Sequence, residues 1–199
     1  GNGGVYVAGI YQSSFTIGGF NLTQDQGAYY QGFVFHLDNN NAVLWANSVG
    51  DLNIAAHDFV ASLAIDQNNN LLASGRISNG SQFNGYRTFI KQYNTNTGAL
   101  MTTLYSDLMD HNIEIEDGIE INVDNNGDIY MFTAAQTNSY NSNYVFNSVP
   151  LNPVLENSNI LYKIDPTFNH QLWFAACGAQ LNGSRRYRKL LNKSPLTIN

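Results

Sequence analysis

The 199-residue chain has few cysteines and few charged residues, and it has no long apolar run. Its single cysteine, Cys177, excludes an intramolecular disulfide framework and any zinc site built from several cysteines. Charged residues make up 12% of the chain, and its net charge is −6 at pH 7. Because phosphate contacts need a basic surface, no nucleic-acid partner is predicted. No apolar stretch approaches the roughly 20 residues of a membrane span, so no membrane insertion is predicted.

Recognisable catalytic motifs are absent as well. The chain contains no GxSxG motif, no P-loop and no GxGxxG at the start of a helix. None of its four histidines belongs to an HExxH pair, although His57 beside Asp58 and His111 near Glu114 suggest a metal or acid–base site weakly. No catalytic residue is therefore assigned from the sequence, and a non-enzymatic role is favoured.

A short polar segment recurs five times between apolar runs. Its copies begin at Asp38, Asp66, Asn94, Asp124 and Asp165. Asp, Asn and Gly tolerate positive φ and bond to their own backbone, so each segment predicts a hairpin turn. The flanking residues alternate or cluster as in strands, and no helical period is sustained. With 43% hydrophobic and 13% aromatic residues, the chain can bury a sizeable core, and the predicted fold class is all-β.

Two kinds of hairpin alternate along the chain. An example of the first kind is SLAIDQNNNLLASG, and an example of the second is FVFHLDNNNAVLWANSVG. The three copies of the second kind carry Trp45, Met101 and Trp173, which are expected to occupy equivalent positions. Four antiparallel strands that repeat about every 60 residues are typical of a β-propeller blade. The expected strands are 4–10, 32–38, 43–49, 59–66, 70–77, 87–93, 99–105, 117–124, 128–134, 159–165 and 171–176. Ile65 and Val123 are expected on inner strands, where a buried charge would cost several kcal/mol.

The predicted architecture is a single β-propeller segment that spans residues 1–199. It consists of a partial blade at 1–50, blades at 51–106 and 107–178, and a partial blade at 179–199. Closed propellers have about four to eight blades, so about three and a half blades cannot close a ring. The chain begins at GNGG and stops at LTIN, both within repeat units. We therefore expect it to belong to a longer chain or a complex that completes the propeller.

The repeats also resemble a known family. The pattern DxxGxxYxxG followed by FVxxLDxxxxxLW is similar to the bacterial SBBP-type β-propeller repeat and, more distantly, to the NHL repeat. The resemblance covers nearly the whole chain and implies a propeller fold. The hairpin LDNNNAVLW also resembles the tryptophan-docking hairpin of quinoprotein propellers, with Met101 standing in the tryptophan place of one unit.

The long connections are the expected binding surface. Successive connections of an antiparallel meander leave by opposite faces, so the short turns of this chain are expected on one face and its long connections on the other. Long loops on a rigid scaffold commonly bind partners. Segments 11–31 and 135–158 are rich in Tyr, Asn, Ser and Gly, as binding loops are, and Tyr rings can also stack on sugars. The alternative is that these rings pack inward. The candidate binding residues are Tyr11, Tyr29, Tyr30, Tyr86, Tyr140, Tyr144, Asp107 and Asp110.

Two segments contain residues that could supply oxygen ligands to Ca²⁺. DNNGD (residues 124–128) has oxygen ligands at alternate positions, but Ala135 stands where an EF-hand loop requires an acidic residue. A hairpin turn is the preferred interpretation there, and the acidic stretch 107–120 is the better Ca²⁺ candidate. No cofactor and no metal ligand are predicted.

Together these features predict a non-catalytic binding or scaffold module of a bacterial surface or secreted protein. Such a module would act outside the cell or at its surface, in adhesion or assembly with a protein or glycan partner. Two alternatives stay open. One is a propeller hydrolase, lyase or quinoprotein with a site at the central channel, and the other is a structural component of a large assembly.

Overall fold

The computed structural model describes residues 4–24, 28–50, 57–78, 86–105, 113–137, 145–146, 149–150, 158–168 and 171–178. These residues contain fifteen β-strands and no helix. Eleven strands form three antiparallel sheets, and the other four form two short hairpins. The all-β prediction is confirmed.

Each large sheet is a meander of strands that follow one another across the sheet. Sheet 1 has the order β1 (Gly4–Tyr11), β4 (Gln31–Asp38) and β5 (Val43–Val49). Sheet 2 consists of β6 (Phe59–Ile65), β7 (Asn70–Ser78), β8 (Tyr86–Asn94) and β9 (Leu100–Tyr105). Sheet 3 consists of β10 (Ile113–Val123), β11 (Ile129–Thr137), β14 (Ser158–Ile164) and β15 (Gln171–Gly178). All eleven expected strands are present with small differences at their ends.

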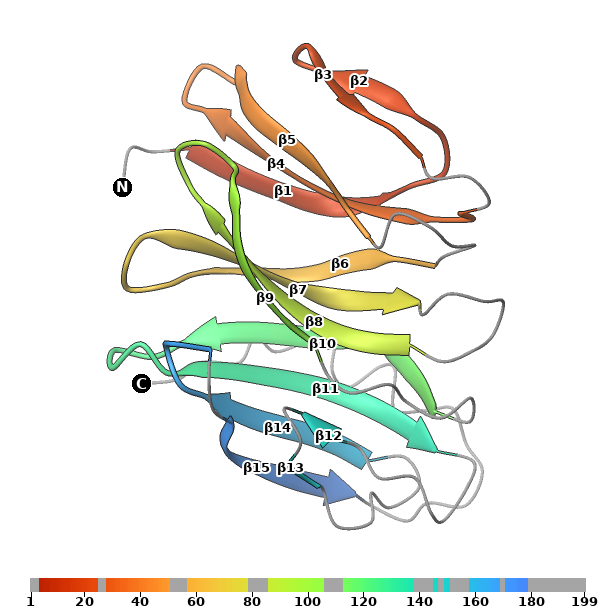
Figure 1. Ribbon diagram of the computed structural model, residues 1–199, viewed down its shortest axis with the longest axis vertical. Coiled ribbons are helices and arrows are strands. Elements are labelled where there is room, and N and C mark those ends of the chain that lie inside the picture. Colours follow the sequence, from red (N-terminus) through yellow and green to blue (C-terminus); the bar gives the residue numbers. More distant parts are fainter. Residues whose placement is uncertain are drawn as a thin grey trace.

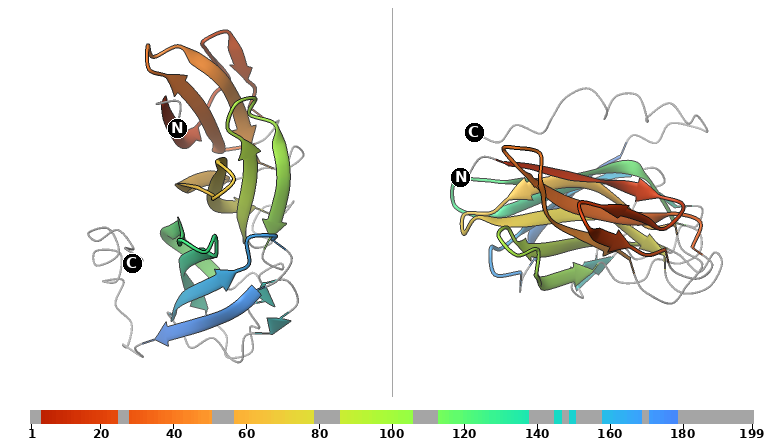
Figure 2. Two further views of the ribbon diagram at one scale, coloured as in Figure 1. Left: turned by 90° about the vertical axis from the view of Figure 1, so that its left-hand side faces the viewer. Right: turned by 90° about the horizontal axis from the view of Figure 1, so that it is seen from above.

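The three sheets are stacked along the long axis of the molecule, with sheet 2 in the middle (Figure 1). β6 packs against β1 on one side and against β10 on the other, so the leading strands of the three sheets lie together. The view along the strands shows the sheets spreading away from these strands (Figure 2, left).

Both faces of sheet 2 are buried because its residues alternate between two cores. Leu71 and Ala73 face a cluster shared with Val34 and Trp45 of sheet 1. Leu72, between them in sequence, joins a cluster shared with sheet 3. This is the period of two that side chains follow along a strand. A strand buried on both faces is mostly apolar and has no charged residue, as in the run LLASG, where Ser74 is the one polar side chain.

The five polar segments form hairpin turns, as predicted. In the first, the Asp38 Oδ1 atom accepts the backbone N–H groups of Asn40 and Ala42, both at 2.8 Å. Asp66 and Asp124 repeat this arrangement. A residue with positive φ closes each turn, at Asn41, Asn69, Gly98, Gly127 and Phe168. Phe168 is the exception to the residue types that favour this conformation, and its ring is buried in the core between sheets 2 and 3.

The expected equivalence of Trp45 and Met101 is wrong by one residue. Trp45 pairs with His36, and Thr102 pairs with Gln92 at the matching place of sheet 2. The reason is turn length, because the Asn94 turn closes with a Gly98 N–H to Asn94 O bond and is one residue longer than the Asp38 turn. Met101 therefore corresponds to Leu44, and both side chains are exposed.

Ile65 lies on the predicted strand, but its side chain is not buried as the sequence predicted. Its side chain is 41% exposed at the end of β6, where the strand enters the turn. A charge there would stay partly hydrated, so the expected cost of several kcal/mol does not apply. Val123 is partly buried and packs against the core between sheets 2 and 3.

Two short hairpins within the long connections were not predicted. β2 (Phe15–Ile17) and β3 (Phe20–Leu22) enclose Gly18 and Gly19, whose φ angles are 57° and 87°. A Gly-Gly pair with two positive φ angles is a known signal for a tight hairpin turn. The second hairpin joins β12 (Val145–Phe146) to β13 (Val149–Pro150).

The turns also connect neighbouring sheets. The Trp45 indole N–H donates to the Thr95 carbonyl at 2.8 Å, and the Asn47 side-chain amide donates to the Gly98 carbonyl at 2.8 Å. Gln67 makes a similar bond to the Asn125 carbonyl in the next sheet. A row of side-chain to backbone hydrogen bonds therefore runs across the three sheets at their turns.

Candidate functional site

The molecule has two ends that differ in construction. We call the end that carries the five hairpin turns the elbow end, and the opposite end, where β1 and β7 finish and β6 begins, the loop end. Figure 1 shows the turns on the left and the loop end on the right. As the sequence predicted, the short turns occupy one end, and the strand ends that lead to the long connections occupy the other.

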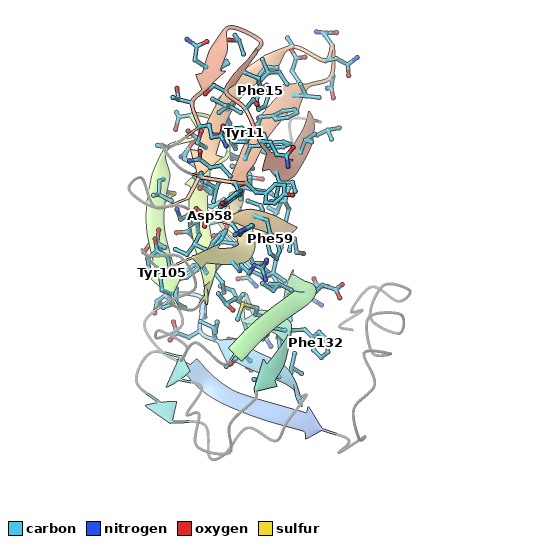
Figure 3. All side chains as sticks on the ribbon, turned by 90° about the vertical axis from the view of Figure 1, so that its right-hand side faces the viewer. Tyr11, Phe15, Asp58, Phe59, Tyr105 and Phe132 are labelled. Carbon is cyan, nitrogen blue, oxygen red and sulfur yellow. The ribbon has the colours of Figure 1, made fainter. Side chains whose placement is uncertain are left out.

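Tyr11, one of the predicted binding residues, is buried at the loop end. Its hydroxyl donates to the Thr23 carbonyl at 3.0 Å and hydrogen-bonds with Ser48 Oγ at 2.7 Å. Its ring packs edge-on against Phe15 with 5.3 Å between centroids, and Figure 3 shows the two side chains together. Tyr11 is 8% exposed, so it links the connection after β1 to the sheet and offers little surface to a binding partner. The ring of Tyr11 therefore packs inward, which is the alternative that the sequence left open for the tyrosines of these loops.

Tyr29 and Tyr30 form an aromatic group with His57. Tyr30 and His57 make an isolated parallel β-bridge, and the Asp58 N–H donates to the Tyr30 carbonyl at 3.1 Å. The Tyr29 ring stacks on the His57 imidazole with centroids 5.2 Å apart and planes 11° apart. Tyr29 is 59% exposed, so this ring does not pack inward as Tyr11 does.

A cavity of about 510 Å³ lies beside this group, between sheets 1 and 2. It is lined by Gly9, Ile10, Tyr30, His57, Asp58, Phe59, Val60, Ala61 and Arg76. Residues from the end of β1, the start of β6 and the end of β7 converge here because the two sheets are stacked. Figure 3, which views the loop end, shows Asp58 and Phe59 at this junction. The volume lies within the range of about 300–1,000 Å³ that is usual for small-ligand sites.

The two charged side chains of the cavity wall point differently. The Arg76 guanidinium lies over the ring of Phe59, its cross-strand neighbour, at 4.8 Å. Asp58 is only 1% exposed, and a Cβ atom added to Gly50 would lie 2.5 Å from its Oδ2 atom. The same Cβ would lie 3.4 Å from Gln31 Nε2. The Asp58 Oδ2 atom therefore lies close to Gly50, while Asp58 itself belongs to the cavity lining.

The pKa of His57 is lowered from its ordinary value, first by burial and second by the positive charge of Arg76. The imidazole is therefore neutral at pH 7 and lies within the field of the guanidinium. The described lining residues also include His57, Asp58 and Tyr30, whose side chains can accept or donate protons. The cavity offers aromatic faces, an apolar floor and a guanidinium, which suits binding.

Arg76, Phe59 and Ile10 were not selected from the sequence. Arg76 is the one charged residue within the run NLLASGRIS, and a charge in an otherwise uncharged strand was the available signal. Of the remaining predicted residues, Tyr86 begins β8 and pairs with Ser78. Tyr140, Tyr144, Asp107 and Asp110 lie outside the described residues.

The carboxylates of DNNGD serve the turn. Asp124 Oδ1 accepts the N–H groups of Asn126 and Asp128. Its Oδ2 atom accepts the Tyr130 hydroxyl at 3.3 Å, while Asp128 forms an ion pair with Lys163 at 2.7 Å. In the part of the chain that the structure describes, no group of three or more His, Cys, Asp or Glu residues could hold a metal ion. Nor does that part contain a helix long and apolar enough to cross a membrane.

The sequence matches no protein-family model and no curated protein. The candidate site is therefore assigned from its geometry alone.

Proposed function

We propose that the chain is a β-propeller segment that binds a partner at its loop end and has no catalytic role. The propeller is supported by three stacked antiparallel meanders, in which β6 packs against both β1 and β10. Among the described residues, sheet 1 has no strand at the free edge of β1 to match β6 and β10.

The cavity between sheets 1 and 2, with the exposed Tyr29 ring beside it, is the observation that carries the binding role. A cavity of about 510 Å³ suits a ligand of one or two rings better than a broad protein surface, so we favour a glycan over a protein as the partner. The module then belongs to a bacterial surface or secreted protein that acts in adhesion. The resemblance to the SBBP-type repeat is the support for that location.

A glycan array tests this function. The fluorescently labelled chain is expected to bind a subset of the printed oligosaccharides, and Tyr29→Ala is expected to weaken this binding about 3- to 10-fold, because a stacking face is lost. Met101→Ala is the matched control, since it removes a side chain of similar exposure (54%) from the elbow end. Equal losses in the two variants, or no binding to any glycan, would contradict the proposal.

A further inference from the structure

We infer that the cavity selects an uncharged sugar ring, such as a terminal neutral hexose, over the same ring carrying a carboxylate or an amine. This inference rests on the proposed glycan-binding function and adds the charge class of the sugar. It follows from the opposite charges of two side chains in the cavity wall and from the apolar and aromatic groups beside them.

The cavity wall contains one acidic and one basic side chain. Asp58 and Arg76 both line the cavity. His57, also in the wall, is neutral at pH 7, because burial and the charge of Arg76 lower its pKa. A bound anion would be attracted by Arg76 and repelled by Asp58, and the reverse holds for a bound cation. The wall therefore offers no unopposed partner to an ion of either sign.

The two charged side chains also have partners within the fold. The Arg76 guanidinium lies over the Phe59 ring at 4.8 Å, and Asp58 is only 1% exposed. Each of the two residues makes a further interaction within the described structure. A charged ligand would have to compete with these interactions and would lose hydration on entry, which is costly for an ion that is not fully paired. A neutral hydroxyl group loses much less.

The apolar part of the wall suits the ring of a sugar. Ile10 from the end of β1 and Val60 and Ala61 from β6 supply apolar surface, and Tyr30 and His57 supply aromatic rings. The Ile10 side chain is 50% exposed, so a ligand can cover it. A pyranose ring has C–H groups on its faces and hydroxyl groups around its rim. Its faces can therefore cover apolar side chains while its rim keeps hydrogen bonds to water or to polar groups.

Each charged form of the sugar meets its own obstacle. The chain carries a net charge of −6, which repels anions from its surface in general, and Asp58 adds to this repulsion within the cavity. The same net charge attracts cations at long range, but Arg76 repels them within the cavity. Asp58 is thus expected to act against carboxylates and Arg76 against amines.

Three matched methyl hexosides test the charge class by calorimetry at pH 7. Their C6 group is a hydroxymethyl group, a carboxylate or a protonated aminomethyl group, and each is used in its gluco, galacto and manno forms. We expect the tightest ligand to be a neutral hexoside and its two charged counterparts to bind about tenfold more weakly or worse.

Substitutions test the apolar and the charged parts of the wall separately. Ile10→Ser should weaken binding of the neutral hexoside about three- to tenfold, because apolar cover is lost. Val5→Ser is the matched control, since Val5 lies on the same strand, is 58% exposed and is not among the described lining residues. Arg76→Gln should raise the affinity for the amine relative to the neutral hexoside about threefold or more, because Asp58 then acts alone. A purely structural role of Arg76 would not change this ratio.

Thermal unfolding confirms that each variant is folded, and the comparison of the three hexosides needs only the unchanged chain. A uronate or an amine that binds as tightly as its neutral counterpart would overturn the inference, as would equal losses in Ile10→Ser and Val5→Ser. If binding of the charged sugar were weakened by Tyr29→Ala, the proposed function would still stand. Loss of the glycan-array signal altogether would remove both proposals.

Discussion

The two ends of the interface between sheets 1 and 2 are built in opposite ways. At the elbow end the interface is closed, because Trp45 is buried, hydrogen-bonded to the Thr95 carbonyl and covered by Gly98. At the loop end the same two sheets leave a cavity of about 510 Å³ beside the exposed Tyr29. The difference indicates that contacts at one end hold the sheets together, so that the other end can carry a cavity on a rigid base.

The largest expected difference is in the free energy of unfolding after truncation of one aromatic side chain at each end. Trp45→Ala should lower the free energy of unfolding by about 3–5 kcal/mol, because it leaves a cavity in the core between the sheets. Tyr29→Ala should cost only about 0.5–1 kcal/mol, since its ring is mostly exposed. Urea unfolding of the two variants measures both values. Similar losses would mean that the elbow end does not hold the interface.

Substitutions of two glycines separate the energy cost of backbone strain from the cost of displacing the Trp45 ring. Gly98 and Gly19 both have positive φ, at 71° and 87°. A Cβ at Gly98 would lie 2.6 Å from the Trp45 ring, whereas a Cβ at Gly19 would meet nothing within 4 Å.

Each substitution by Ala should cost about 1–2 kcal/mol for the backbone, and Gly98→Ala should cost about 1–3 kcal/mol more, because the indole must move. The difference in urea midpoint between Gly98→Ala and Gly19→Ala measures the second part. If the two variants unfold together, the packing of Trp45 against the turn is unimportant.

The smallest expected effect is that of pH on the stability of the fold, through His57 at the loop end. The folded chain lowers the pKa of His57 below the ordinary value of 6.5 that the unfolded chain keeps. Between those two values the unfolded state binds more protons, so stability is full above about pH 6.5 and falls as the pH drops through the folded value. The loss of stability from pH 7.5 to pH 5 should be slightly larger for the wild type than for His57→Gln.

An NMR titration of Arg76→Gln measures how much the charge of Arg76 contributes to the lowered pKa of His57. Removal of the guanidinium should raise the pKa of His57, but the pKa should stay below its ordinary value, because burial is the larger cause. An unchanged pKa would show that Arg76 does not act on this imidazole.

The strands and turns were predictable because their signals are local. An aspartate that accepts two backbone N–H groups, followed by a residue that tolerates positive φ, sets each turn between apolar runs. The one-residue error at Met101 came from the longer Asn94 turn, whose closing bond depends on Gly98 and is not visible in the apolar pattern. Ile65 is exposed because of its place at a strand end, which residue type alone does not reveal.

The site was predictable only in part. Tyr29 belongs to a loop whose composition is typical of binding segments, and its ring is exposed. The cavity itself combines residues 9–10, 30, 57–61 and 76, which meet only once the two sheets are stacked. Tyr11 lies in the same loop composition as Tyr29 but is buried, because its hydroxyl finds partners in Thr23 and Ser48.

The contact between the Asn94 turn and Trp45 couples the folding of sheet 1 to that of sheet 2. Part of the core that sheet 1 contributes to is completed by a turn of sheet 2, some fifty residues later in the chain. A fragment that ends within residues 51–56 would keep Trp45 but lose the carbonyl to which its indole donates. We therefore expect sheet 1 to need sheet 2 in order to fold stably, so that a transferable unit would contain both sheets.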